Sequence, residues 1–163
     1  MTASAHEASE FSLGPVGEFL RSLWELNHLL ERASRCTEAL SGVTGQQRMM
    51  VRFVGKYPGL TASQLAAHFH LDPGTVSIAL NRLEKKGLVE RRRAAQDKRR
   101  VTLGLTPLGR KLDGEVIGVT ERAVTQLLEV ASPAEVSRFR SVLAALTAEL
   151  SVQIEASRAS EPR

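Results

Sequence analysis

Arginine and lysine residues are concentrated in one short stretch of the chain. Residues 85–100 contain eight of them against two acids, Glu90 and Asp97, whereas the formal net charge of the whole 163-residue chain is only +4. Positive charge at this density attracts polyanions such as the phosphate backbone of nucleic acids. The basic residues are Lys85, Lys86, Arg91, Arg92, Arg93, Lys98, Arg99 and Arg100.

The residues just before this stretch have types suited to contacting base pairs. Apolar spacing predicts a helix over Asp72–Lys86, with Val76, Leu80 and Leu83 on its inner face and Gly87 as its stop. The opposite face carries short polar and basic side chains, which fit base edges and phosphates in a major groove. These outward residues are Thr75, Ser77, Ile78, Asn81, Arg82 and Lys85.

Three of the outward side chains match particular groups of DNA. Asn81 suits adenine, Arg82 suits guanine or a phosphate, and Ile78 suits a thymine methyl group. The alternative is an ordinary solvated helix face. A capped helix before this one, a tight turn at residues 69–72 and a basic hairpin after it favour DNA binding.

A change of hydrophobic period after the helix predicts a β-hairpin. Val101, Leu103 and Leu105 alternate with small residues, as in a half-buried strand, and residues 88–92 can pair with them. The polar loop at 93–98 should project, so that its cations follow phosphates and an arginine enters a minor groove. The alternative is a charged surface turn without a role in binding. The hairpin candidates are Arg92, Arg93, Asp97, Lys98, Arg99 and Arg100.

The rest of the chain predicts helices around this unit. Capping boxes begin at Thr44, Thr61 and Ser132. The expected fold is mainly α with a small β-hairpin (α+β), a winged helix-turn-helix flanked by N- and C-terminal dimerisation helices. Six helices are expected, at about residues 16–40, 44–56, 61–69, 72–86, 106–130 and 132–156. The expected organisation is a disordered N-terminus at 1–14, a dimerisation helix at 15–43, the DNA-binding domain at 44–106, C-terminal dimerisation helices at 107–156 and a disordered tail at 157–163.

The apolar stripes of the first and last helices are longer than one module of this size can cover. Two-fold pairing would bury them and set two recognition helices about 34–36 Å apart, which matches a pseudo-palindromic operator. The alternative is that these helices pair with each other within one chain.

The stretches 60–66, 72–91, 97–99 and 105–109 together resemble the MarR family of transcriptional regulators. The resemblance implies a homodimer that binds double-stranded DNA, as a repressor, with the recognition helix in the major groove. It also implies that Arg99 enters the minor groove and that Asp97 supports it. Many members of the family carry arginine at the position of Ile78, so no guanine contact is expected there.

Other function classes find little support in the sequence. It has no glycine-rich phosphate loop with its lysine, no serine-centred elbow and no convincing acid pair, so we expect no enzyme and no cofactor. The runner-up is a winged-helix module that binds protein instead of DNA. No apolar run reaches about 18 residues, so no membrane contact is expected. The single cysteine fits a reducing cytoplasm.

Control of activity leaves weaker signals. Cys36 is a redox-sensor candidate, although a lone cysteine is more often an inert apolar residue. His68 and His70 do not share a helix face and have no cluster of other ligands, so no metal site is expected. The resemblance makes a small-molecule effector plausible, in a crevice beside the dimerisation helices. Its candidate residues are Trp24, His28, Arg48, Met49 and Arg52, each equally plausible as a core or interface residue.

Overall fold

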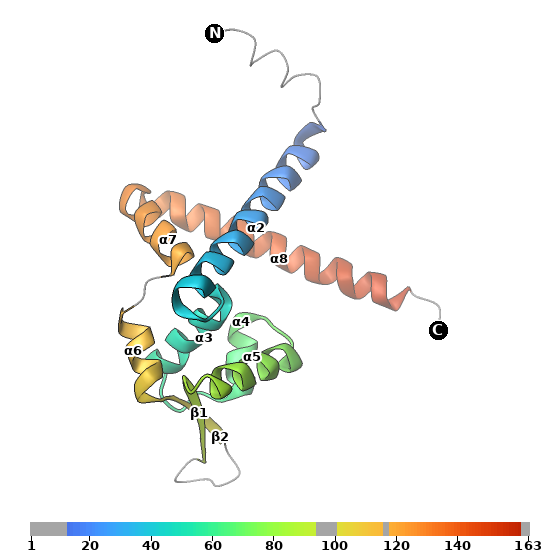
Figure 1. The fold of residues 1–163 in the computed structure, drawn as a ribbon. Helices are drawn as coiled ribbons and strands as arrows, with labels where there is room; N and C mark the ends of the chain where they lie inside the picture. Colours follow the sequence, from blue (N-terminus) through green and yellow to red (C-terminus); the bar gives the residue numbers. More distant parts are fainter. Residues whose placement is uncertain (1–12, 94–100, 116–117, 161–163) are drawn as a thin grey trace. The chain divides into compact units, whose positions relative to one another are not determined.

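The computed structural model describes residues 13–93, 101–115 and 118–160. Within these ranges the chain forms seven helices and one two-stranded hairpin, which confirms the mainly helical fold (Figure 1). The chain divides into two compact units, residues 1–121 and 122–163. The elements are α2 (Gly14–Ser41), α3 (Gly45–Lys56), α4 (Ala62–Phe69), α5 (Pro73–Lys85), β1 (Val89–Arg93), β2 (Val101–Leu105), α6 (Pro107–Glu115), α7 (Val119–Val130) and α8 (Pro133–Ala159).

The first unit has a single apolar core. Helices α3, α4 and α5 and the hairpin each contribute one side to it, because each carries apolar residues at the period of its own secondary structure. Removal of these side chains from water is the main stabilising contribution to this unit. The core side chains are Val43, Met50, Val51, Val54, Leu65, Ala66, Val76, Ala79, Leu80, Leu83, Leu88, Val89, Leu103 and Leu105.

All three predicted capping boxes are present. In each box, the hydroxyl of the N-cap residue accepts a hydrogen bond from the backbone N–H of the residue three positions later. The side chain of that later residue in turn accepts a hydrogen bond from the backbone N–H of the N-cap residue. The boxes start α3 at Thr44, α4 at Thr61 and α8 at Ser132. They fix where these helices begin.

Two expected boundaries are wrong. The single helix expected at 106–130 is two helices, since α6 ends at Glu115 and α7 begins at Val119. Gly118 lies between them outside any helix, and its N–H donates to the Glu121 carboxylate at 2.6 Å, which starts a new helix. Helix α8 also continues to Ala159, so residues 157–159 are helical and not part of a tail. No glycine or proline interrupts the sequence there.

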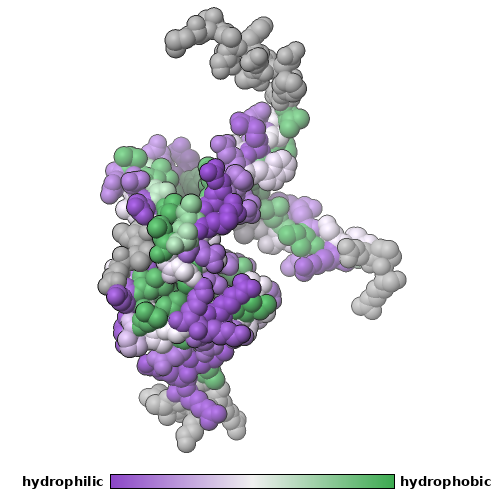
Figure 2. Space-filling model, viewed as in Figure 1, coloured by the Kyte–Doolittle hydropathy of each residue, from purple (hydrophilic) through white to green (hydrophobic). Residues whose placement is uncertain are grey.

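The second unit consists of most of α7 and all of α8. No described residue of α8 is buried. Large apolar side chains are instead exposed along it, among them Phe139, Val142, Leu150, Val152 and Ile154. Figure 2 shows hydrophobic side chains on the surface of this helix.

Candidate nucleic-acid interface

Helix α5 is fixed at its N-terminal end by Asp72. The Asp72 carboxylate accepts hydrogen bonds from the backbone N–H of Gly74 at 2.7 Å and of Thr75 at 3.0 Å, and also from the Thr75 hydroxyl. These donors, the hydroxyl first, lower the pKa of Asp72. Pro73 follows in the first helical turn, where its missing N–H is not needed. The Thr75 hydroxyl is therefore engaged in the cap.

The C-terminal end of α5 is equally sharp. Gly87 has a positive φ of 67°, which glycine adopts without steric cost. Its N–H donates to the Glu84 carbonyl at 2.8 Å, and the N–H of Leu88 donates to the Leu83 carbonyl at 3.0 Å. This is a Schellman motif, and Leu83 and Leu88 are both buried beneath it. Helix α5 and the hairpin are thus joined by a short, defined turn.

The two faces of α5 divide as the sequence predicts. Val76, Ala79, Leu80 and Leu83 are buried in the core. Ile78 is 56% exposed, although it is apolar, so it is not part of that core. The side chains that sequence assigns to DNA all lie on exposed residues, namely Thr75, Ser77, Ile78, Asn81, Arg82 and Lys85.

The hairpin is anchored at one end. Strands β1 and β2 pair antiparallel, with Val89 opposite Leu105 at the base. Both residues and Leu103 are buried. The N–H of Leu103 also donates to the Leu60 carbonyl at 2.7 Å, which ties β2 to the segment before α4. The base of the hairpin therefore belongs to the core, and its other end is free to carry charge.

The outer half of β1 is basic. Arg92 and Arg93 are both exposed, and Arg92 pairs with the Glu90 carboxylate on the same strand. Figure 2 shows hydrophilic side chains over the region of the hairpin and the neighbouring α5. The remaining candidates of the hairpin, Asp97, Lys98, Arg99 and Arg100, lie outside the described residues.

Arg91 connects the hairpin to α5. Its guanidinium donates to the Glu84 carboxylate at 2.6 Å and to the side-chain oxygen of Asn81 at 3.1 Å. Sequence reasoning counted Arg91 only as part of the basic stretch. The spacing of Asn81 and Glu84 by three residues, which places both on one side of a helix, was the signal that could have suggested a shared partner.

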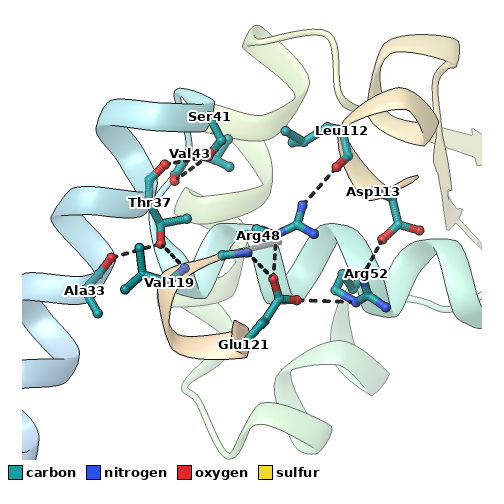
Figure 3. A network of polar contacts seen from close by, with 11 residues as sticks. Ala33, Thr37, Ser41, Val43, Arg48, Arg52, Leu112, Asp113, Val119 and Glu121 are labelled. Carbon is teal, nitrogen blue, oxygen red and sulfur yellow. Dashed lines mark hydrogen bonds and ion pairs between the residues drawn. The ribbon is translucent and has the colours of Figure 1, made fainter. Parts of the chain in front are cut away.

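A buried polar network lies beside the core, where α3 meets the start of α7 (Figure 3). Arg48 is 1% exposed, and its Nε lies 2.7 Å from the Glu121 carboxylate. A second guanidinium nitrogen donates to the Leu112 carbonyl at 2.9 Å, and the third, Nη2, has no hydrogen-bond partner among the described residues. Arg52 lies 3.4 Å from Glu121 and 3.7 Å from Asp113.

The same network reaches α2. The Thr37 hydroxyl donates to the Ala33 carbonyl at 2.9 Å and accepts from the Val119 N–H at 3.1 Å. Thr37 is 1% exposed, so both bonds are shielded from water. The network therefore fixes the first turn of α7 to both α2 and α3. The two arginines spaced by four residues in α3, Arg48 and Arg52, were its only trace in the sequence.

The five effector candidates have different surroundings. Trp24, His28, Met49 and Arg52 are exposed, and Arg48 is committed to the buried network. An open groove of about 550 Å³ in the same unit is lined by other residues, among them Leu40, Val43, Lys86, Leu88, Leu108 and Leu112. None of the five candidates lines this groove.

The cysteine and histidine candidates are also placed. Cys36 is exposed on α2. The ring of His68 lies 4.1 Å from that of Phe53, between centroids, and His70 is the C-cap of α4 in the left-handed conformation. Among the described residues no group of three or more His, Cys, Asp or Glu side chains gathers as metal ligands would. Within the same residues no helix is long and apolar enough to cross a membrane.

Known proteins resemble this chain over the same region. The MarR family model matches residues 41–100. The transcriptional regulator TtmR of Methylorubrum extorquens is 34% identical over 89 residues, which are 55% of this chain and 46% of that protein. The organic hydroperoxide resistance transcriptional regulator of Bacillus subtilis is 27% identical over 97 residues, 55% of this chain and 66% of that protein. The matched part thus spans about half to two thirds of these curated relatives.

Solved structures share the fold over more of the chain. FabT of Streptococcus pneumoniae in complex with DNA is 26% identical, with a TM-score of 0.61 over 87% of this chain and 99% of that one. The MepR–DNA complex of Staphylococcus aureus is 24% identical, with a TM-score of 0.68 over 81% and 97%, and it supports the fold alone. The family model, the similar regulators and the shared fold agree with one another. Residues 41–100 match the MarR family of transcriptional regulators, and the chain is similar in fold to solved regulators of this kind.

Proposed function

We propose that this protein is a sequence-specific regulator that binds double-stranded DNA as a homodimer. Helix α5 would enter the major groove and the hairpin would enter the minor groove of each half of a pseudo-palindromic operator. Where that operator overlaps a promoter, the bound dimer would act as a repressor. A small-molecule effector and a cytoplasmic location stay predictions from the sequence, and for Cys36 an inert role stays favoured over oxidant sensing.

The observation that carries this proposal is the two-faced character of α5. One face is buried in the core, while Ser77, Asn81, Arg82 and Lys85 are exposed on the other. Both ends of the helix are capped by defined hydrogen bonds, so its outward side chains are held on a rigid element. The solved structure of FabT in complex with DNA supports this, because it is a protein of this fold bound to DNA.

The exposed apolar faces of the terminal helices support the homodimer. Leu127 and Val130 of α7 are 57% and 83% exposed, and α2 exposes Trp24 to 66%. Large apolar side chains exposed along a helix favour a covering partner, because extended apolar patches are rare on soluble monomers and usually mark an interface. Sedimentation equilibrium at micromolar concentration should give twice the mass of the chain.

Binding of selected duplexes by the full chain tests the proposal. Fluorescence anisotropy should show an affinity that falls by about 10³–10⁵ between 50 and 200 mM salt, if six to ten phosphates are contacted. Arg82→Ala and Arg99→Ala should each weaken binding, whereas Arg158→Ala, in the last turn of α8, should not. Unchanged affinity in the first two variants would favour the protein-interaction module instead.

A further inference from the structure

The structure brings one arginine of the hairpin against two side chains of the recognition helix. Arg91 of β1 donates through Nη1 to Glu84 at 2.6 Å and through Nη2 to the Oδ1 atom of Asn81 at 3.1 Å. Because the two acceptors stand three residues apart on α5, the planar guanidinium fits both at once. The side chains of Arg91 and Glu84 are only 35% and 27% exposed, so this ion pair is partly shielded from solvent.

The contact fixes the direction of the Asn81 amide. An asparagine side chain has one accepting edge, its oxygen, and one donating edge, its NH₂ group. Since arginine has donors only, the edge of Asn81 that faces Arg91 must be the oxygen. The NH₂ group, which has no hydrogen-bond partner among the described residues, is therefore the edge left for another molecule.

The orientation decides which base Asn81 can read. Bidentate recognition of adenine needs an acceptor and a donor side by side, because adenine presents N6–H₂ next to N7. Guanine presents two neighbouring acceptors, O6 and N7, which suit an outward NH₂ group. Adenine shares the N7 acceptor but presents N6–H₂ in place of O6, so an Asn81 NH₂ group placed against that position would meet a donor instead of an acceptor.

We propose that Arg91 is a positioning residue that turns the donating edge of Asn81 outward, so that Asn81 selects guanine over adenine at one position of each half-site. This inference rests on the proposed function and replaces the adenine contact expected from sequence. It assigns Arg91 a role in specificity instead of phosphate binding, because its charge is already paired with Glu84.

The test is the base preference of the full chain and its variants. Duplexes selected by the wild type are varied one position at a time, and relative affinities are measured by competition. Wild type should prefer guanine over adenine at one position of each half-site, by roughly 5- to 150-fold as expected for one good base contact. Asn81→Ala should abolish the preference at that position only.

Arg91→Ala frees the amide to rotate and should bring the guanine-to-adenine ratio at the same position to within about twofold of unity. Arg91→Lys keeps the charge but not the planar fork, so it should lose most of the preference too. Arg92→Ala is the matched control: it removes the same charge from the next residue, whose partner is Glu90 on its own strand. It should lower affinity for all duplexes alike.

A double variant separates orientation from general damage. When Arg91→Ala is added to Asn81→Ala, the base preference should not change further. Thermal unfolding should show that the Asn81→Ala variant and the double variant are both folded. The inference is overturned if Arg91→Ala retains the wild-type preference, or if the position that depends on Asn81 prefers adenine in the wild type. Absence of any sequence preference in the wild type would instead overturn the proposed function itself.

Discussion

The buried pair of Arg48 and Glu121 predicts an unequal response to removal of its two partners. Arg48 is only 1% exposed, and its Nη2 already lacks a partner in the described structure. Glu121→Ala would leave this buried guanidinium without its carboxylate partner. Removal of one partner of a buried ion pair costs about 3–5 kcal/mol. Because the Glu121 side chain is 21% exposed, we expect a value at the low end, about 3 kcal/mol.

Arg48→Met should cost much less. It removes the buried charge and fills most of the volume, while Glu121 keeps Arg52 at 3.4 Å and the Gly118 N–H at 2.6 Å. Replacement of a buried charge by an apolar side chain is often close to neutral, so we expect about 1 kcal/mol. The double variant should lose less stability than the sum of the losses of the two single variants, by about 1–2 kcal/mol. The two effects are not independent, because the partners are in direct contact.

The assay is urea unfolding at pH 7 and one fixed protein concentration, since a dimer's stability depends on concentration. A loss of about 3 kcal/mol corresponds to a fall in Tm of roughly 6–12 °C for a chain of this length. Glu18→Ala is the control, because it removes an exposed pair with Arg21 at 3.1 Å and should have little effect. A loss below about 1 kcal/mol for Glu121→Ala, or a larger loss for Arg48→Met, would refute the reasoning.

Three further predictions concern the stability of the first unit. Asp72→Asn should be less stable than wild type at pH 7, and the difference, measured by urea unfolding, should be smaller at pH 3. The pKa of Asp72 is lowered from 3.8 in the folded state, so the stabilisation by its carboxylate is present above that pH and is lost as the pH falls through the folded-state value. Gly109→Ala should lower the free energy of unfolding by about 1–3 kcal/mol, because the added Cβ would lie 2.0 Å from the Leu88 carbonyl oxygen. Gly114→Ala, whose added Cβ would meet nothing within 4 Å, should raise it by about 0.5–1 kcal/mol, and equal Tm values for the two variants would contradict this. Leu80→Ala, at a fully buried position, should cost about 2–5 kcal/mol in the same measurement, and a smaller loss would mean that the core collapses around the site.

Local signals in the sequence were sufficient for most of the fold. The capping boxes at Thr44, Thr61 and Ser132 fixed three helix starts because both of their hydrogen bonds are made within four residues. The apolar period assigned the inner face of α5, and Gly87 marked its end. These features depend on neighbours in sequence, so a single chain is enough to predict them.

Contacts between distant residues could not be predicted in the same way. Arg48 and Glu121 are 73 residues apart, and nothing in either sequence neighbourhood selects the other as its partner. The break at Gly118 was missed for the same reason, because the Glu121 carboxylate that starts α7 is also held by Arg48. The role of Arg91 required knowing that β1 runs back alongside α5, which is a tertiary fact.

The bond from Leu103 to the Leu60 carbonyl also bears on the solubility of the hairpin. A two-stranded ribbon has two open edges, and unpaired edges invite strand addition and aggregation between copies. At Leu103, in the middle of β2, that strand already has a backbone partner in Leu60, while β1 ends in Arg92 and Arg93, whose long charged side chains hinder pairing with a second copy. The protein can therefore extend a narrow ribbon into solvent without polymerising through it.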